Sequence, residues 1–421
     1  MIPNLNNWIK HTAALSALLG ITACSSSPAL EIIIQQEEDN QRLPEMIEVP
    51  ANEWKKILQE GQREVVLFNQ SNEEIPYQIT HDGNLIFLVQ AKTKEHKFKL
   101  VTGTPQNVVP SVYGRQYPER ADDIAWENDC SAYRAYGPAL QKRGERAFGY
   151  DIMTKLGENL VIEKRYAMEL DKTARKQMKE WYQAGLREKA DSLSRAISYH
   201  IDHGNGMDCY NVGATLGGGT NALLDAEGNI IYPYCYKDYK VVENGPLRFS
   251  VELTFHPTDI GDNQSVVEKR IITLDKGSCL NKTTVRYENL QKESSFAVGI
   301  VIHPQNKDGY LMGNSDNYIA YVDSTNNVKA NNGLIYVGAV FPKKLSNKSV
   351  QWFDKTDKSH PGALGHILAI STYQPHTDFV YYWGSGWSKN EQKYEKDWEQ
   401  YLKKYSRQLH QPLTVTYKIQ D

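Results

Sequence analysis

The chain has 421 residues, of which 40% are hydrophobic and 24% are charged, so it is long enough to bury a large core in one domain or two. Its formal net charge of −3 provides no overall basic field, which argues against a nucleic acid as partner. A negatively charged ligand would have to be bound by local arginine or lysine side chains.

The first residues of the chain have the pattern of an export signal. Lys10 and His11 precede the apolar run AALSALLGITA, which ends directly before Cys24 and is too short to span a bilayer as a helix. This pattern predicts a lipoprotein signal peptide over residues 1–24, with Cys24 as the lipidated residue, and a tether over residues 25–46. An ordinary signal peptide with an incidental cysteine is the alternative. We therefore expect a periplasmic or outer-membrane lipoprotein whose contact with a membrane is its N-terminal lipid alone.

Residues 47–421 have mostly the pattern of β-strands. Apolar and polar residues alternate in 248–255, 296–302 and 413–419, and a period of two places one strand face in a core. The pattern predicts a mainly β fold in which residues 47–421 form one large antiparallel β-sandwich domain. Residues 47–105 would either form a small N-terminal sheet of their own or supply edge strands of the main body.

Two segments interrupt this strand pattern and are predicted to be helical insertions. Residues 171–197 are rich in lysine, arginine, glutamate, glutamine and alanine and contain no proline, which favours one long helix or two short ones on the sheet surface. Residues 390–408 form the second helical segment and carry Trp398 and Leu402.

The first cluster of candidate functional residues lies in the stretch WENDCSAYRAYGP, residues 126–138. Strand alternation places Arg134 and Tyr136 on one face and Tyr133 and Ala135 on the other. A guanidinium binds a carboxylate through two parallel hydrogen bonds, so Arg134 and Tyr136 are candidates for binding an acidic ligand. An exposed arginine on a strand is the structural alternative.

The second cluster lies in YHIDHGNGMDCYNVGATLGGG, residues 199–219. His200 and His203 fall in a glycine-broken loop, and Asp208 and Tyr210 follow on a shared face. Gly217–Gly219 would let the backbone approach a ligand closely, or would form a tight corner of a sheet. His200, His203 and Asp208 could bind zinc or calcium, so a divalent metal is the alternative to our expectation of no cofactor.

Two further candidates occur later in the chain. Arg248 follows Asn-Gly-Pro-Leu and could enter the same cleft as the second cluster. His303 ends a predicted strand directly before Pro304, a common position for an active-site residue at a sheet edge.

Taken in order, WENDCSAYRAYGP, GYDIMTK, the stretch 199–219 and ENGPLR resemble a family of exported proteins of unassigned domain type from glycan-degrading bacteria. That family is encoded in gene clusters for uronate-containing polysaccharides, and one branch is similar to an ulvan oligosaccharide dehydratase. The resemblance implies a super-sandwich like that of mutarotases. It also implies elimination of water from the non-reducing-end uronic acid of an acidic oligosaccharide, which gives a 4,5-unsaturated uronate.

That chemistry assigns expected roles to the candidates. Arg134 or Arg248 would neutralise the uronate carboxylate and so stabilise the enolate that forms when the C5 proton is removed. His200 and His303 are the candidate bases, Tyr210 is the candidate acid, and Asp208 would orient a histidine.

The remaining candidates, Tyr136 and His203, would contact the substrate. Three other functions stay open: a polysaccharide lyase, a glycoside hydrolase and a glycan-binding lipoprotein without catalysis. The hydrolase would need two carboxylates, for which Asp202, Asp208 and Glu127 are available.

Overall fold

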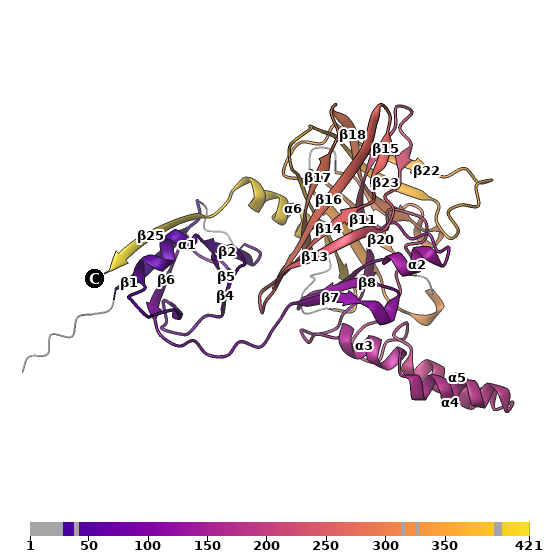
Figure 1. The fold of residues 1–421 in the computed structure, drawn as a ribbon, viewed down its shortest axis with the longest axis horizontal. Coiled ribbons are helices and arrows are strands. Elements are labelled where there is room, and N and C mark those ends of the chain that lie inside the picture. The colour runs from indigo at the N-terminus through magenta and orange to yellow at the C-terminus, as the bar shows by residue number, and fades with distance from the viewer. Residues whose placement is uncertain (1–27, 38–41, 314–316, 326–327, 391–397, 421) are drawn as a thin grey trace, which may run out of the picture.

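The computed structural model describes residues 28–37, 42–313, 317–325, 328–390 and 398–420, and these form a small body and a larger one (Figure 1). The predicted signal peptide and Cys24 lie outside the described residues. Within the described part of the chain, no helix is both long and apolar enough to cross a membrane.

The small body is a β-sandwich built from both ends of the described chain. One sheet has the strand order β25-β1-β6-β3 and the other β2-β5-β4. Apolar side chains from both sheets, among them Ile32, Leu67 and Phe87, are fully buried between them. The elements are β1 (Ala29–Gln35), β2 (Glu45–Val49), α1 (Ala51–Trp54), η1 (Lys55–Ile57), β3 (Val65–Asn69), β4 (Tyr77–Ile79), β5 (Leu85–Val89), β6 (Glu95–Thr102) and β25 (Thr414–Gln420).

The predicted tether over residues 25–46 is therefore wrong in its extent. Strand β1 pairs with β6 on one side and with β25 on the other. Leu30, Ile32 and Ile34 alternate into the core and are at most 1% exposed, a period-two pattern that a flexible tether would not need. Residues 47–105 do contribute to a separate small body, but it begins at Ala29 and includes the C-terminal strand.

The large body is a sandwich of two antiparallel sheets. The nine-stranded sheet has the order β13-β14-β16-β17-β24-β21-β20-β19, with β15 paired to β16, and the five-stranded sheet has the order β12-β11-β18-β23-β22. The strands of the first are β13 (Tyr236–Asn244), β14 (Arg248–Phe255), β15 (Thr258–Ile260), β16 (Asn263–Asp275), β17 (Leu280–Glu288), β19 (Tyr310–Leu311), β20 (Tyr318–Asp323), β21 (Ile335–Val340) and β24 (Phe379–Trp387). Those of the second are β11 (Gly218–Leu224), β12 (Ile230–Ile231), β18 (Ser294–Ile302), β22 (Asn347–Trp352) and β23 (Gly365–Tyr373).

The core between these sheets is made by the alternating residues that the sequence singled out. Phe249 and Val251 of β14 and Val298 and Ile300 of β18 are fully buried in one apolar cluster. Every strand pair in the described part of the chain is antiparallel; β14 with β16 and β18 with β23 are two examples. The prediction of a mainly β fold with a large antiparallel sandwich is confirmed.

A third sheet lies against this sandwich and carries the candidate site. Its order is β10-β9-β8-β7, with β7 (Tyr113–Tyr117), β8 (Asp123–Glu127), β9 (Ala132–Ala135) and β10 (Asp151–Met153). One face inserts Trp126 and Tyr133 into the main core, where the ring centroid of Tyr133 is 5.1 Å from that of Trp383. The opposite face packs on α3 (Ile162–Glu169) through Tyr166. Arg134 belongs to this second face, as strand alternation predicts.

The helices occur where the sequence lacks strand alternation. Residues 171–197 form two helices, α4 (Lys172–Gln183) and α5 (Arg187–Ile197), which contact each other and project from the body (Figure 1). No residue of α4 is buried, so the expectation that this segment lies on the sheet is wrong. Helix α6 (Trp398–His410) instead covers the nine-stranded sheet through Trp398 and Leu402. The shorter helices are α2 (Pro138–Lys142), η2 (Pro118–Arg120), η3 (Pro304–Asn306) and η4 (Val328–Ala330).

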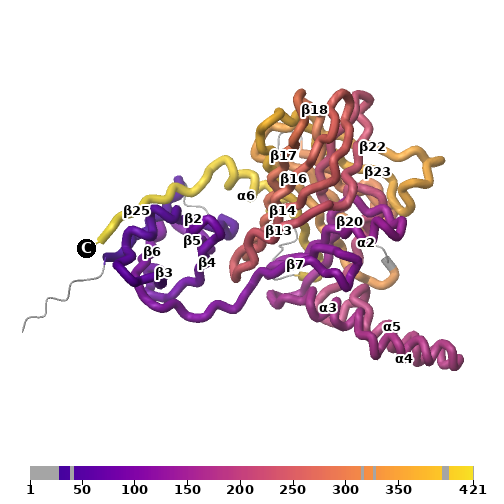
Figure 2. The backbone as a smooth tube through the Cα atoms, in the orientation of Figure 1, coloured from indigo at the N-terminus to yellow at the C-terminus, as the bar shows by residue number. Residues whose placement is uncertain are grey.

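The chain crosses between the two bodies twice, once before β7 and once between α6 and β25 (Figure 2). Side chains also join them. The Gln78 side-chain carbonyl accepts hydrogen bonds from the backbone N–H groups of Leu247 and Arg248, at 3.0 and 2.9 Å. The two bodies are thus held together by specific contacts as well as by the connecting chain.

Candidate active site

A cavity of about 620 Å³ opens beside the third sheet. Its wall is built from the end of β9, the loop 144–147, the extended segment 208–214 and the loop 358–361. Segments more than 200 residues apart in sequence therefore meet around one space. The lining residues are Arg120, Arg134, Tyr136, Gly144, Glu145, Arg146, Ala147, His200, Asp208, Cys209, Tyr210, Asn211, Val212, Gly213, Ala214, Lys358, Ser359 and Pro361.

Arg134 lies at the centre of a buried group of carboxylates. It pairs in register with Asp151 on the neighbouring strand β10, and its Nη2 atom donates hydrogen bonds to the carboxylates of Asp151 and, at 2.9 Å, Asp208. Its Nε atom is 3.9 Å from an oxygen of Asp123. We call Asp123, Asp151 and Asp208 the carboxylate cluster. Since the Arg134 side chain is only 4% exposed and already binds these carboxylates, it is less available to the carboxylate of a ligand than an exposed arginine.

The carboxylate cluster holds more negative charge than its partners neutralise. Arg134 and Arg120 are its two cations, and Arg120 is 3.7 Å from Asp123 with its Nε donating to the Tyr199 hydroxyl at 3.1 Å. Burial raises the pKa of Asp123 to about 6. Burial likewise raises the pKa of Asp151, and the nearby charge of Asp208 adds to the effect.

Tyr136 connects the carboxylate cluster to the cavity. Its ring lines the cavity, and its hydroxyl is 3.0 Å from Oδ2 of Asp151 and 3.5 Å from Nη2 of Arg134. Burial and the charge of Asp151 raise the pKa of the Tyr136 phenol well above its usual value. Tyr136 therefore keeps its proton at neutral pH and can donate it in a hydrogen bond.

His200 presents a basic nitrogen to the cavity. Its Nδ1 atom is 2.9 Å from the backbone carbonyl oxygen of Asp208. A carbonyl oxygen accepts hydrogen bonds and cannot donate one, so Nδ1 carries the proton and Nε2 of the neutral ring keeps its lone pair. The carboxylate of Asp208 is 3.8 Å from the same Nδ1. Asp208 thus orients His200, chiefly through its main-chain oxygen.

Tyr210 and His303 lie side by side behind the cavity wall. Their rings meet edge to face with centroids 5.7 Å apart, and Nδ1 of His303 is hydrogen-bonded to the carboxylate of Asp323. The Tyr210 hydroxyl and Nε2 of His303 are both buried, without a hydrogen-bond partner among the described residues. The ring of Tyr210 lines the cavity but its hydroxyl does not reach it, and His303 does not line it. The expected roles of Tyr210 as acid and His303 as base therefore lack access to a ligand.

Two other predicted binding residues lie outside the cavity. The Arg248 guanidinium pairs with Asp275 at 2.6 Å and with Glu48 at 3.3 Å, where the two bodies meet. His203 is exposed and its Nε2 is 3.0 Å from the carbonyl oxygen of Ser198. The prediction that Arg248 enters the same cleft is wrong, because its charge is used to join β14 to β16 and to the small body.

The predicted metal alternative is not assembled. His200 faces the cavity while His203 turns to Ser198, and among the described residues no group of three histidine, cysteine, aspartate or glutamate side chains is arranged to hold a metal ion. Asp208 is bound to Arg134 instead.

The glycines of 217–219 serve packing and do not line the cavity. Gly217 has φ +56°, and a Cβ there would lie 2.5 Å from the carbonyl oxygen of Tyr150. Gly219 has φ +119°, and a Cβ there would lie 2.9 Å from Trp383. Of the two alternatives, the tight corner of a sheet is the one observed.

The carboxylates that a hydrolase would need have structural partners. Glu127 is buried, pairs with Lys155 at 2.8 Å and accepts the N–H groups of Val161 and Ile162 at the start of α3. Asp202 accepts the N–H groups of Gly204 and Gly206 within its own loop.

Several cavity residues escaped the sequence reasoning. Asp151 lies in GYDIMTK and Asp123 lies three residues before WENDC, yet the sequence does not show that either residue faces Arg134. Arg120, Arg146 and Lys358 come from a short helix and two loops, which carry no periodic signal. Strand pairing of 151 with 134 would have revealed Asp151, since it places a carboxylate directly opposite the arginine.

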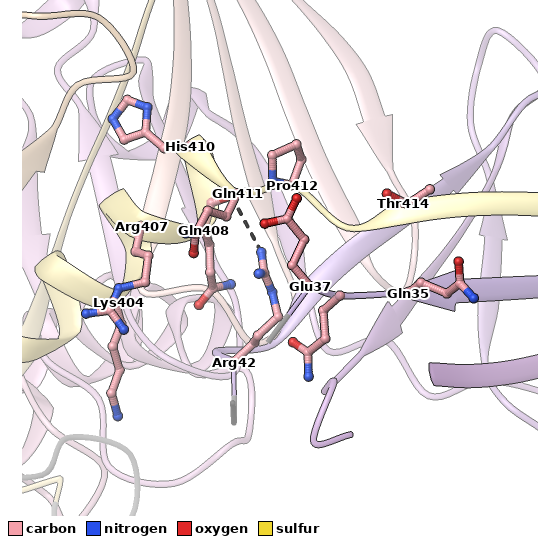
Figure 3. Close-up of a pocket in the computed structure, with 11 residues that line it drawn as sticks. Gln35, Glu37, Arg42, Lys404, Arg407, Gln408, His410, Gln411, Pro412 and Thr414 are labelled. Atoms are coloured by element: carbon pink, nitrogen blue, oxygen red, sulfur yellow. Dashed lines mark hydrogen bonds between the residues drawn. The ribbon is translucent and has the colours of Figure 1, made fainter. Parts of the chain in front are cut away.

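A second hollow, of about 270 Å³, lies between α6 and the small body, next to the start of β25 (Figure 3). Arg42 reaches across it toward the end of α6, with Nη2 3.5 Å from the carbonyl oxygen of Gln408, and pairs with Glu45 at 2.5 Å. Lys404, Arg407 and His410 complete its basic side. The contacts of Arg42 and Leu43 with Gln408 join the small body to α6. We place the candidate active site at the larger cavity, where His200 is oriented by a hydrogen bond to the main chain.

The chain belongs to the family defined by the domain of unknown function DUF4861, whose model matches residues 34–415. It is similar to Uncharacterized protein P7 of Formosa agariphila, with 27% identity over 333 residues that cover 76% of this chain and 74% of that protein.

Among solved structures, the chain is similar to an alpha-mannosidase from Enterococcus faecalis V583, with a TM-score of 0.42 and 9% identity over 93% of this chain and 46% of that one. A glycosyl hydrolase family 38 protein from Enterococcus faecalis gives a TM-score of 0.44 and 9% identity over 93% and 48% of the two chains. The chain thus spans about half the length of each of these structures.

Proposed function

We propose that this protein is a carbon–oxygen lyase that removes water from the terminal uronic acid of an acidic oligosaccharide and leaves a 4,5-unsaturated uronate. The observation that carries the proposal is the convergence, on one cavity, of an oriented histidine lone pair, a protonated tyrosine hydroxyl and several cations. A uronate elimination needs these three kinds of group.

His200 is the base in this proposal. The C5 proton of a uronate lies next to the carboxylate and is only weakly acidic, so its removal needs a base held at the sugar ring. His200 has its Nδ1 proton fixed by the Asp208 carbonyl, which leaves Nε2 to accept the C5 proton. Its side chain is 56% exposed, so a ligand in the cavity can reach it.

Arg120 is the partner of the substrate carboxylate. Negative charge moves onto that carboxylate as the C5 proton leaves, and a guanidinium there stabilises the enolate. Unlike Arg134, Arg120 keeps 24% of its side chain exposed and lines the cavity. Arg146 and Lys358 are exposed cations of the same cavity and add to the attraction for an acidic sugar.

Tyr136 stands where Tyr210 was expected, as the group that protonates the leaving hydroxyl. Tyr136 lines the cavity and its phenol keeps its proton, whereas the Tyr210 hydroxyl is buried behind the wall. A volume of about 620 Å³ falls within the range of small-ligand sites, roughly 300–1,000 Å³. This size favours the end of an oligosaccharide over the middle of a polymer, and hence a dehydratase over an endo-acting lyase.

The proposal is tested by incubating the protein with a panel of uronic-acid oligosaccharides and following ultraviolet absorbance and product mass. We expect absorbance from a new C4=C5 double bond together with the loss of one water per chain. His200→Gln should abolish the signal, while His203→Gln, in the same loop but outside the cavity, should retain it. Cleavage of the chain without unsaturation would replace the proposal with hydrolysis, and binding without any change in mass would make the protein a glycan-binding one.

The same proposal places the protein outside the cytoplasm, anchored by a lipid on Cys24. The support is the apolar run that ends at this cysteine. A Cys24→Ala variant should move from the membrane fraction to the soluble fraction of cells that export it. Retention of the variant in the membrane fraction would contradict the anchor.

A further inference from the structure

The carboxylate cluster has one negative charge more than the two arginines beside it can neutralise. Asp123 and Asp151 have fully buried side chains and that of Asp208 is 3% exposed. Leaving an unpaired charge in such a place is costly, and proteins avoid the cost by binding a proton. An elimination that expels hydroxide needs a proton at the same spot, delivered without waiting for solvent.

We propose that the carboxylate cluster holds a dissociable proton on Asp151 and that Tyr136 transfers a proton from it to the leaving hydroxyl. This inference rests on the proposed elimination and deepens it. It makes Tyr136 the catalytic acid and Asp151 a positioning residue that restores the tyrosine proton. The carrying observation is the hydrogen bond that the Tyr136 hydroxyl donates to Oδ2 of Asp151, 3.0 Å away, together with the position of Tyr136 in the wall of the cavity.

The step balances in atoms and electrons. His200 Nε2 takes the C5 proton, and the electron pair of that C–H bond becomes the second bond between C4 and C5. The C4–O bond breaks with its electron pair on oxygen, which takes the proton of the Tyr136 hydroxyl and leaves as water. The Tyr136 oxygen takes the Asp151 proton. His200 is then protonated and Asp151 ionised, and exchange with solvent resets both.

The surroundings of Asp151 support its role. Arg134 on β9 and Tyr136, the residue after β9, are both hydrogen-bonded to Asp151. Asp208 in the cavity wall binds the same Nη2 atom of Arg134 as Asp151 does. Asp123 of β8 shares the same arginine. Tyr166 of α3, Tyr199 and Arg120 also lie beside Arg134. Arg165 lies near Asp208, and Cys209 and Tyr210 of the cavity wall lie near Asp151. Arg134 and Tyr136 are both bonded to Asp151 and both line the cavity. Of these two, Tyr136 carries the hydroxyl group that can pass the proton on to a ligand, because a guanidinium stays protonated.

The test compares two substrates that differ in the leaving group. One is a uronic-acid oligosaccharide with its ordinary 4-hydroxyl, and the other carries fluorine at C4, which leaves as fluoride and needs no proton. We expect Asp151→Asn and Tyr136→Phe to lower kcat on the hydroxyl substrate by roughly 10²–10⁴-fold, the size of a general-acid contribution. Both variants should stay within a few-fold of wild type on the fluoro substrate, which also shows that they fold.

A His200→Gln variant should lose activity on both substrates, because both require removal of the C5 proton. Equal losses on the two substrates for Asp151→Asn and Tyr136→Phe would overturn the inference while leaving the elimination standing. If wild-type protein unsaturates neither substrate, the proposed function itself fails.

The pH profile gives a second readout that a merely structural role would not change. Since the acid must be protonated, kcat/KM on the hydroxyl substrate should fall as the pH rises through the pKa of Asp151. Asp123→Asn removes the surplus charge, so it should move this fall to lower pH. The fluoro substrate should show no such fall in either protein. If kcat/KM on the hydroxyl substrate falls at the same pH in Asp123→Asn as in wild type, the charge of Asp123 does not influence the proton on Asp151, which contradicts the inference.

Discussion

His366 is a buried histidine that holds the backbone behind the cavity wall. It lies on β23 and is 0% exposed, and its Nε2 accepts the N–H of Leu216 at 3.0 Å, just after the wall segment 208–214. A backbone N–H can only donate, so this contact requires an unprotonated Nε2. Protonation of His366 would break the bond and place a charge in the core.

Burial, with smaller contributions from His360 and His303, lowers the pKa of His366 from 6.5 to about 3. A histidine whose folded pKa is depressed contributes stability above the unfolded pKa, and this stability is lost as the pH falls below 6.5. Between pH 7.5 and pH 5.0, His366 binds a proton in the unfolded chain but stays neutral in the folded chain. At about 1.4 kcal/mol per pH unit, the loss over this interval is about 2 kcal/mol.

The perturbation is His366→Gln, whose side-chain oxygen can accept the Leu216 N–H without titrating. We expect a constant loss of stability from imperfect packing, but a fall between pH 7.5 and 5.0 that is about 2 kcal/mol smaller than in wild type. Urea unfolding at the two pH values measures both. His376→Asn is the matched control, because that ring is exposed to water in the folded chain as in the unfolded one. A fall of the same size in wild type and His366→Gln would refute the reasoning.

Two further predictions concern the carboxylate cluster and α6. Burial raises the pKa of Asp123 from 3.8 to about 6, so the folded chain binds a proton here that the unfolded chain releases, and stability is lost as the pH rises between these values. The stability of Asp123→Asn relative to wild type should therefore increase by up to about 3 kcal/mol between pH 4 and 7. If urea unfolding gives the same difference between the two proteins at every pH, Asp123 is not a buried group that binds a proton. Leu402 of α6 is fully buried against the nine-stranded sheet, so Leu402→Ala should lower the free energy of unfolding by about 2–5 kcal/mol. The control Lys404→Ala, on the exposed face of α6, should lower it little. Equal losses in the two variants would show that α6 is not packed as described.

The sequence predicts the sandwich well because its signal is local. Alternation in 248–255 and 296–302 reports burial of one strand face, and β14 and β18 follow it closely. The small body was predicted less well, since β1 depends on pairing with residues 414–420 at the far end of the chain. Its alternating leucine and isoleucines were visible, but their partners were not.

The candidate site was predicted in part for the same reason. His200, Asp208, Arg134 and Tyr136 do line one cavity, because two short segments rich in polar groups were brought together by the third sheet. The prediction for Arg248 is wrong because the partner of this arginine comes from another strand, which the local sequence does not reveal. That partner is Asp275, which lies opposite Arg248 in the β14–β16 pair.

The role of Tyr210 depends on whether its hydroxyl points into the cavity or into the core, and the residue type alone does not determine this direction. Its sequence position beside Asp208 was sound, but the segment 208–214 runs past the cavity without regular strand structure. Alternate residues therefore do not share a face as they would on a strand. Tyr136 directly follows the end of β9, and its hydroxyl is bonded to Asp151.

Strand β25 pairs with β1 along all of Ala29–Gln35, so the small body is complete only after two segments nearly 400 residues apart have met. Until residues 414–420 pair with it, β1 has one edge without a partner strand. An open edge of this kind recruits strands from other molecules. We therefore expect a variant that lacks residues 414–420 to aggregate through the open edge of β1.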